Sequence, residues 1–246
     1  MSDDLIRARP PARNLAVGGN RGYDRLATVY SALEWAMFGG NLDRCRETFA
    51  NRIVDTVNAN ARLLLCGGGT GRLLLRLATA KPESTITSLD FSHAMIAAQQ
   101  RRCATLRNGQ RITWQLADLR TWNAPSQAYD EIILPFVLDC FSPDELQVVL
   151  KTVASALAPE GRIWVLDFRH PVSASLFANM IAGIKLWLMH RFFRLSTSLP
   201  NQRLIDLPNL LTQTVGRPVF EQDHMAGLVW MSAYRSSSES RSQLVL

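Results

Sequence analysis

The chain has 246 residues, of which 47% are hydrophobic and 20% are charged. This balance is typical of a globular protein with a sizeable core, and it excludes a mostly disordered chain. The net charge of +6 comes mainly from arginines spread along the sequence. Because no dense basic tract is present, nucleic acid is disfavoured as a partner.

Neither end of the sequence predicts a packed or membrane-inserted element. Residues 1–20 contain prolines and glycines without an apolar block, and residues 236–246 begin with three serines, so both are predicted to be flexible tails. No apolar run is long enough to span a bilayer. We therefore expect a cytoplasmic protein with one domain over residues 21–235. Since no two cysteines show metal-binding spacing, we expect reduced thiols and no metal.

Between the tails, helical patterns alternate with short apolar runs. The N-terminal half predicts a helical stripe from Tyr23 to Met37 and a helix from Asn41, as its cap, to about Val57. Three strands are expected next, at residues 62–66, 85–90 and 111–117, with helices between them. Ser92 is placed to cap the helix after the second strand.

The second half continues the alternation. A strand is predicted at residues 131–134, and Ser142 opens a capping box with proline at the first helical position. Gly161 breaks the chain before a fifth strand at residues 163–167. The segments 218–221 and 227–233 lie too close together for a helical crossover, so they predict an antiparallel hairpin.

This order of elements predicts a parallel sheet covered by helices on both faces. The continuous apolar runs at residues 63–66 and 132–134 are typical of central strands, which are buried on both faces. The third strand alternates apolar and polar residues, which favours a place at the edge.

A glycine-rich turn follows the first strand and has the spacing Gly67, Gly69, Gly71. Glycines let a ligand approach the backbone closely, and the helix that follows presents free amides. The dinucleotide fingerprint would need a glycine at Arg72, and the lysine of a P-loop is missing. The turn therefore predicts a ligand site of another kind.

The spacing of this turn resembles motif I of the class I S-adenosylmethionine-dependent methyltransferases. Asp90 ends the second strand, where that family has an acidic residue on the ribose hydroxyls. Asp118 follows the third strand, where the family's aspartate contacts the adenine amino group. Residues 157–161 resemble the turn before the family's fifth strand, and residues 23–30 resemble the opening of the UbiE-like branch of ubiquinone and menaquinone biosynthesis.

The resemblance implies a Rossmann-like, doubly wound sheet of about seven strands in the order 3-2-1-4-5-7-6, with the last strand antiparallel, N-terminal helices and a helical lid. It implies S-adenosylmethionine as cofactor and S-adenosylhomocysteine as product. The implied catalytic residues are His170, which follows strand five, and Tyr23. The implied cofactor-binding residues are Gly67, Gly68, Gly69, Gly71, Asp90, Phe91, Met95, Asp118, Leu119, Pro135 and Tyr30.

The sequence departs from the family at Leu65, where an acidic residue usually braces the glycine loop. The triple glycine also resembles aminopropyltransferases, which need acidic residues after strand four. Residues 134–139 are mostly apolar, so that reading is disfavoured. The same segment lacks the polar acceptor of enzymes that methylate nucleobase amines, which again disfavours nucleic acid.

The acceptor is expected to be a small hydrophobic molecule such as a quinone, polyketide, isoprenoid or lipid. The apolar segment 175–195 is predicted to form part of a helical lid over residues 175–215. Its basic and aromatic residues also allow a peripheral membrane contact, and a homodimer contact or a core helix is a further reading. The alternative function is an S-adenosylmethionine-binding protein that catalyses another reaction or acts as a regulatory binder.

Overall fold

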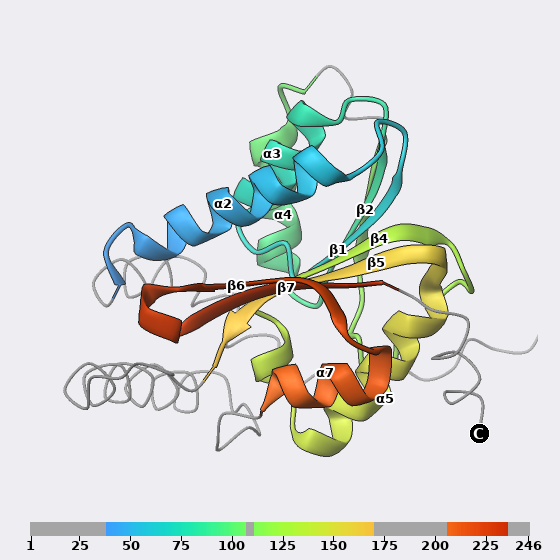
Figure 1. Ribbon diagram of the computed structural model, residues 1–246. Coiled ribbons are helices and arrows are strands. Elements are labelled where there is room, and N and C mark those ends of the chain that lie inside the picture. Colours follow the sequence, from blue (N-terminus) through green and yellow to red (C-terminus); the bar gives the residue numbers. More distant parts are fainter. Residues whose placement is uncertain (1–37, 107–110, 170–205, 236–246) are drawn as a thin grey trace, which may run out of the picture.

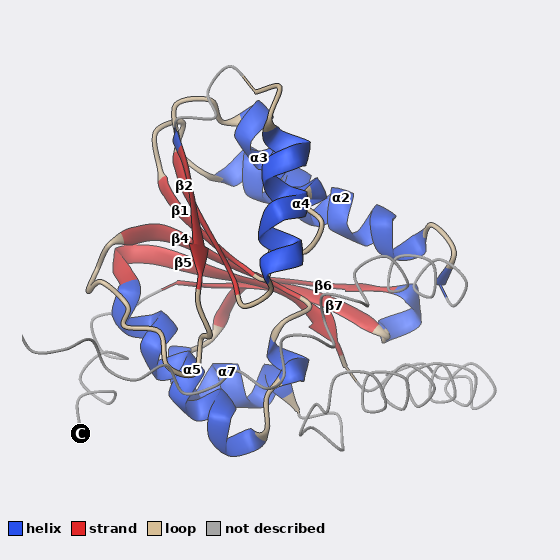
Figure 2. Cartoon of the chain, turned by 180° about the vertical axis from the view of Figure 1, so that it is seen from behind, coloured by secondary structure: helices blue, strands red, loops and turns tan. Residues whose placement is uncertain are grey.

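The computed structural model describes residues 38–106, 111–169 and 206–235. These residues form three layers, with one sheet between two groups of helices (Figure 1). Helices α2 (Asn41–Thr56), α3 (Arg72–Ala80) and α4 (His93–Cys103) cover one face. Helices α5 (Pro143–Ala156) and α7 (Leu207–Val215) cover the other (Figure 2).

The sheet has seven strands in the order β3-β2-β1-β4-β5-β7-β6. The first five strands along the chain are parallel, and β7 is antiparallel to both of its neighbours. This confirms the predicted Rossmann-like order, the edge position of the third strand and the antiparallel hairpin. The strands are β1 (Arg62–Cys66), β2 (Thr85–Asp90), β3 (Ile112–Leu116), β4 (Tyr129–Pro135), β5 (Leu157–Phe168), β6 (Pro218–His224) and β7 (Val229–Arg235).

The central strands are apolar on both faces, which is why they read as continuous runs in the sequence. In β1, Leu63 and Leu65 pack under α2 and α3, whereas Leu64 and Cys66 pack toward α5. When both faces of a strand are covered, its backbone amides and carbonyls find hydrogen-bond partners only in neighbouring strands. Accordingly, β1 lies between β2 and β4.

Two predicted helix caps are confirmed and one is wrong. The Ser92 hydroxyl accepts a hydrogen bond from the Met95 amide, and Ser142 forms a full capping box with Glu145. Asn41 is not a cap: it is the first helical residue, and Gly40 is the residue before the helix, with no side chain to bond the free amides.

Strand β5 is longer than the sequence predicts. Pairing with β4 begins at Leu157, and the register shifts before Arg162, so the turn residues between them form an irregularity inside the strand. Glu160 takes a left-handed conformation there, with φ of 61°. The proline and Gly161 that indicate a turn therefore produce a bulge instead of a break.

Helix α7 lies at the end of the range in which a lid is expected. Its residues Leu207, Leu211 and Val215 are buried in the core between α5 and the sheet. The remainder of that range up to residue 205, with the segment 175–195, lies outside the described residues. Within the described part of the chain, no helix has the length and apolar content to cross a membrane.

Candidate functional site

The carboxyl ends of the parallel strands form one edge of the sheet, where ligands bind in open α/β folds. The glycine loop lies at this edge, between β1 and α3. Gly67, Gly69 and Gly71 have φ angles of 70°, 53° and 83°, which L side chains rarely adopt. The loop conformation therefore requires glycine at the three positions that the motif contains.

The surroundings of the loop differ from one glycine to the next. A Cβ atom on Gly69 would meet nothing within 4 Å, whereas one on Gly67 would lie 3.3 Å from Val137, in the segment after β4. The loop is thus packed at its start and open at Gly69. This opening is the side from which a ligand can reach the loop.

Asp90 lies directly beside Gly69 and forms a second boundary of this open space. It is 5% exposed, and its Oδ2 accepts hydrogen bonds from the Gly69 amide at 3.3 Å and from Gln99 Nε2 at 3.4 Å. Its Oδ1 accepts a bond from the Ser92 amide at 3.1 Å. Burial raises the pKa of Asp90 to about 6, although the amides around it act in the other direction.

Asp118 follows β3 and is held by an arginine. Arg120 donates to both of its carboxylate oxygens and also bonds Glu145 at 3.1 Å. Partial burial acts to raise the pKa of Asp118, but the Arg120 guanidinium holds it below its ordinary value. Leu119 is buried in the same apolar cluster as Leu89 of β2.

The remaining described candidates lie on the same edge. Phe91 follows Asp90, Met95 lies in the first turn of α4 and is 8% exposed, and Pro135 ends β4. Directly after Pro135, Phe136 has φ of 52° and donates its amide proton to Leu166 of β5 at 2.6 Å. Tyr23, Tyr30 and His170, which were also predicted for the site, lie outside the described residues.

Sequence reasoning missed two buried polar side chains near this edge. Asp167, near the end of β5, is fully buried and accepts bonds from the Leu138 amide at 3.0 Å and the Phe168 amide at 2.8 Å. Gln99, on α4, is fully buried against the glycine loop. A signal for Gln99 was present, because it lies four residues from both Met95 and Cys103, on the buried face of its helix.

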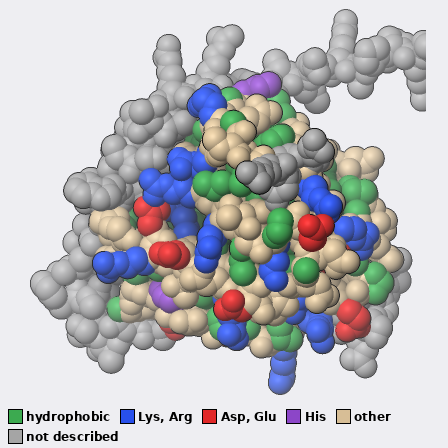
Figure 3. Space-filling model, turned by 90° about the horizontal axis from the view of Figure 1, so that it is seen from above, with side chains coloured by type: hydrophobic (Ala, Val, Ile, Leu, Met, Phe, Trp, Pro, Cys, Tyr) green, Lys and Arg blue, Asp and Glu red, His purple; other side chains and the backbone are tan. Residues whose placement is uncertain are grey.

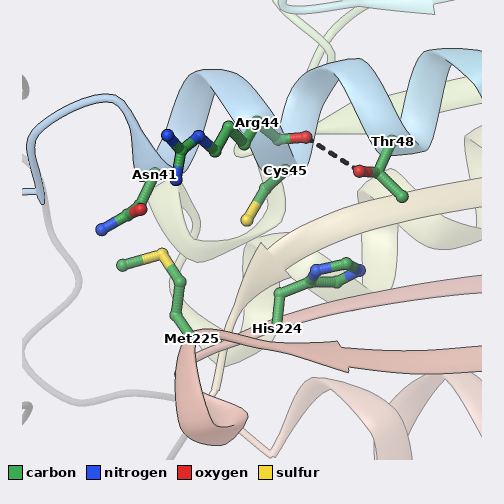
Figure 4. A pocket seen from close by; sticks show the side chains of 6 residues that line it. All are labelled: Asn41, Arg44, Cys45, Thr48, His224 and Met225. Carbon is green, nitrogen blue, oxygen red and sulfur yellow. Dashed lines mark hydrogen bonds between the residues drawn. The ribbon is translucent and has the colours of Figure 1, made fainter.

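A pocket of about 330 Å³ opens between the first turns of α2 and the turn after β6. Figure 4 shows its lining side chains, which are Asn41, Arg44, Cys45, Thr48, His224 and Met225. His224 ends β6 just before the turn, and burial lowers its pKa, so its imidazole is neutral at pH 7. Since β6 and β5 run in the same direction, this pocket lies at the same edge of the sheet as the loop.

A family model described as a methyltransferase domain matches residues 63–161, from β1 to the bulge inside β5. Over these residues the chain is similar to the class I S-adenosylmethionine-dependent methyltransferases. Domains of this class use S-adenosylmethionine. The matched residues include the glycine loop, Asp90 and Asp118, so the family match and the geometry concern the same edge of the sheet.

Two curated methyltransferases are similar to part of this chain. The malonyl-[acyl-carrier protein] O-methyltransferase of Bacillus cereus is 28% identical over 157 residues, which are 64% of this chain and 52% of the relative. The ubiquinone/menaquinone biosynthesis C-methyltransferase UbiE of Geotalea daltonii is 28% identical over 150 residues, 61% of this chain and 62% of the relative. The chain thus matches between half and two thirds of each of these relatives.

Two solved structures share the fold of this chain. The N-methyltransferase NodS of Bradyrhizobium japonicum, in complex with S-adenosylhomocysteine, has a TM-score of 0.58 and 16% identity, and covers 85% of this chain and 98% of its own. PhzM, a pyocyanin biosynthetic protein, has a TM-score of 0.63 and 19% identity over 91% of this chain and 63% of its own.

The described residues fit the cofactor of this class. The two contacts to Asp90 Oδ2 are long, so this oxygen keeps capacity for a hydroxyl donor such as a ribose. The open space beside Gly69 leaves room for a ligand to approach the backbone of the loop. Leu65, by contrast, is fully buried and apolar, so the polar support of the loop comes from other residues.

Proposed function

We propose that the chain transfers the methyl group of S-adenosylmethionine to a small molecule and releases S-adenosylhomocysteine. The observation that carries the proposal is the opening bounded by the left-handed glycines and by Asp90. In this arrangement the ribose hydroxyls donate to the Asp90 carboxylate, and the methionine part of the cofactor lies along Gly69. The sulfonium would then lie at the carboxyl edge of the sheet. The family match supports this assignment.

In this proposal each described site residue has a specific task. Asp90 binds the ribose hydroxyls, and Gly67 to Gly71 contact the methionine part of the cofactor. Phe91 and Met95 border the nucleoside, and Asp118 with Leu119 borders the adenine. Pro135 lies where cofactor and acceptor meet. His170 and Tyr23 remain proposed as catalytic residues, and Tyr30 remains proposed as a cofactor-binding residue.

Methyl transfer from a sulfonium is an in-line displacement on a donor that is already activated by its charge. The protein mainly aligns the two reactants and excludes water, and such positioning contributes about 7–11 kcal/mol in favourable cases. A general base is needed only where the accepting atom is protonated and weakly nucleophilic. The site can therefore work without a fixed catalytic group at the acceptor.

We infer that the acceptor is a small, largely apolar molecule that enters beside the turn after β6. The pocket between α2 and that turn lies at the same edge of the sheet as the proposed site of the sulfonium. Cys45 and Met225 supply the apolar part of its lining, beside polar side chains. The names of two relatives refer to ubiquinone/menaquinone biosynthesis and to malonyl-[acyl-carrier protein]. On the face seen in Figure 3, basic side chains are interspersed with acidic ones, which does not favour a polyanion.

A second function, cofactor binding without methyl transfer, is favoured by Leu65. The test is calorimetric titration of the full chain with S-adenosylhomocysteine, followed by incubation with methyl-labelled cofactor and quinone or malonyl-thioester acceptors. Saturable binding with label in a product supports methyl transfer. Saturable binding with no label in any product supports the second function, and absence of binding contradicts both.

A further inference from the structure

The glycine loop is supported from α4 by one fully buried side chain, that of Gln99. Its Nε2 donates to the Gly69 carbonyl at 3.2 Å and to Asp90 Oδ2 at 3.4 Å, and its Oε1 accepts a bond from the Ser88 hydroxyl at 2.7 Å. Gly69 and Asp90 also bond each other directly. The amide therefore joins the loop to the carboxylate on the opposite side of the opening.

The packing of the loop on Gln99 is close. A Cβ on Gly68 would lie 2.9 Å from Gln99 Nε2 and 2.9 Å from Ser88 Oγ, and one on Gly71 would lie 2.9 Å from the Gln99 Cα atom. Two of the loop glycines are thus required by this side chain and its helix. Gly69 has open space on the side facing away from these contacts.

A buried amide can orient its neighbours because leaving any of its polar atoms unpaired is costly. The Gly69 carbonyl and the Asp90 carboxylate can only accept hydrogen bonds, so the Nε2 end of the amide has to face them. The Ser88 hydroxyl, which is also fully buried, then donates to the Oε1 end. All polar atoms of the amide thus have partners, and the amide ties the loop to Ser88 and Asp90 of β2.

We propose that Gln99, whose Oε1 is paired with Ser88, is the positioning residue that holds Asp90 and the glycine loop in the arrangement that binds the cofactor. This inference rests on the proposed function, since it names the support of the same site. It goes beyond that function in assigning the support to α4, a helix without a predicted role in the cofactor site apart from its first turn. Gln99 acts through Asp90 and Gly69 and does not itself contact the cofactor.

A positioning role of this kind affects the ionisation of Asp90 as well as its place. The amide donates to the ionised carboxylate, so its removal makes ionisation harder and moves the titration of Asp90 upward. The other titratable groups near Asp90 are the buried Cys66 thiol of β1, kept neutral by a pKa raised through burial, and His93 at the start of α4. A purely structural role would not move this titration.

The test is titration of the full chain with S-adenosylhomocysteine between pH 5 and pH 8, for wild type and for Gln99→Met, which keeps the length of the side chain and removes the amide. We expect Gln99→Met to weaken binding about tenfold and to raise the pH of half-maximal affinity by about half a unit. Equal affinity and an equal midpoint in the two proteins would overturn the inference while leaving the proposed function intact.

Two control variants separate this role from other effects. Arg102→Met removes another contact from α4 to the loop, the 2.8 Å bond to the Thr70 carbonyl, but no bond to Asp90. It should change affinity by no more than about threefold and leave the pH midpoint in place. His93→Asn should also leave the midpoint in place; a lost titration in that variant would assign it to His93 and overturn the inference.

A further variant keeps the test decisive if Gln99→Met does not fold. Ser88→Ala removes only the hydroxyl that donates to Gln99 Oε1 and leaves that buried oxygen without its partner, so it should move affinity and midpoint in the same directions by a smaller amount. An unchanged affinity and midpoint in Ser88→Ala would then contradict the proposal. If wild type itself fails to bind S-adenosylhomocysteine, the proposed function fails and the inference fails with it.

Discussion

The carboxylate of Asp167 accepts a hydrogen bond from the backbone amide of Leu138 at 3.0 Å, and thereby joins the end of β5 to the turn after β4. That turn also contains Val137, which packs on Gly67 of the cofactor loop. A single buried carboxyl group thus links three neighbouring strand ends. Its loss should therefore affect both stability and the site.

Replacing Asp167 with alanine should lower the free energy of unfolding by about 2–4 kcal/mol, because two buried amides, those of Leu138 and Phe168, lose their acceptor. Asp167→Asn should cost less, since its single oxygen keeps one of the bonds. Urea unfolding of the two variants measures the difference. Equal stability of Asp167→Ala and wild type would show that these bonds contribute little.

The stability of the wild type should fall as pH rises above 3.8 on account of Asp167. Burial, followed by the nearby charge of Asp139, raises the pKa of Asp167 well above that value. Over the window between the unfolded and the folded pKa, the native state binds more protons than the unfolded one, so stability decreases with pH. Thermal unfolding of Asp167→Asn across the same pH range should show a flatter dependence than wild type.

The affinity for S-adenosylhomocysteine should fall as the pH drops through about 6, where Asp90 becomes protonated and can no longer accept both hydroxyls as a carboxylate. Asp90→Asn should bind about 10- to 100-fold more weakly at pH 8 and lose most of the pH dependence. Calorimetry at several pH values checks both statements. A pH dependence that persists in the variant would point to another group.

The two glycines Gly69 and Gly71 should separate binding from folding when each is replaced with alanine. At Gly69 the added methyl group meets open space, so the cost to stability is the left-handed strain of about 1 kcal/mol, but the methyl occupies the path of the ligand. At Gly71 it would also collide with the backbone of Gln99. We expect Gly69→Ala to lose mainly affinity and Gly71→Ala to lose mainly stability; similar losses in both would contradict this.

A buried ion pair at the opposite edge of the sheet offers a control for all of these variants. Glu131, at the start of β4, bonds the Arg162 guanidinium and accepts a 2.6 Å bond from the Trp164 indole. Glu131→Gln should destabilise the fold by about 3–5 kcal/mol, because Arg162 keeps a charge without its partner. Affinity for S-adenosylhomocysteine, measured below the unfolding transition, should stay unchanged.

The sequence predicts most of the sheet because its strands have simple reasons to form. The sequence predicts the bounds of β1 and β2 to the residue. An apolar run ends at Gly67 in β1, and a segment that begins with β-branched residues ends at Asp90 in β2. The Ser142 capping box likewise depends on four neighbouring residues and needs no tertiary information. Local chemistry of this kind is readable without a structure.

Features that depend on contacts across the fold were not predictable. Glu160 takes a left-handed conformation because β5 keeps its pairing with β4 on both sides of the bulge, which no local pattern shows. Helical spacing places Gln99 on the buried face of α4, but only the packing of α4 on the loop shows what its amide contacts. In the sequence Asp167 is an aspartate near the end of a strand, and only the structure shows that the turn after β4 donates a hydrogen bond to it.

The position of β5 has a consequence for the growing chain. It is buried on both faces, and one of its two hydrogen-bonding partners is β7, which begins only at Val229. Before β7 has been synthesised, one side of β5 has unpaired backbone amides and carbonyls next to apolar side chains. Nascent or prematurely terminated chains therefore expose a surface that invites pairing with a second molecule, and the last strand acts as the closure that prevents it.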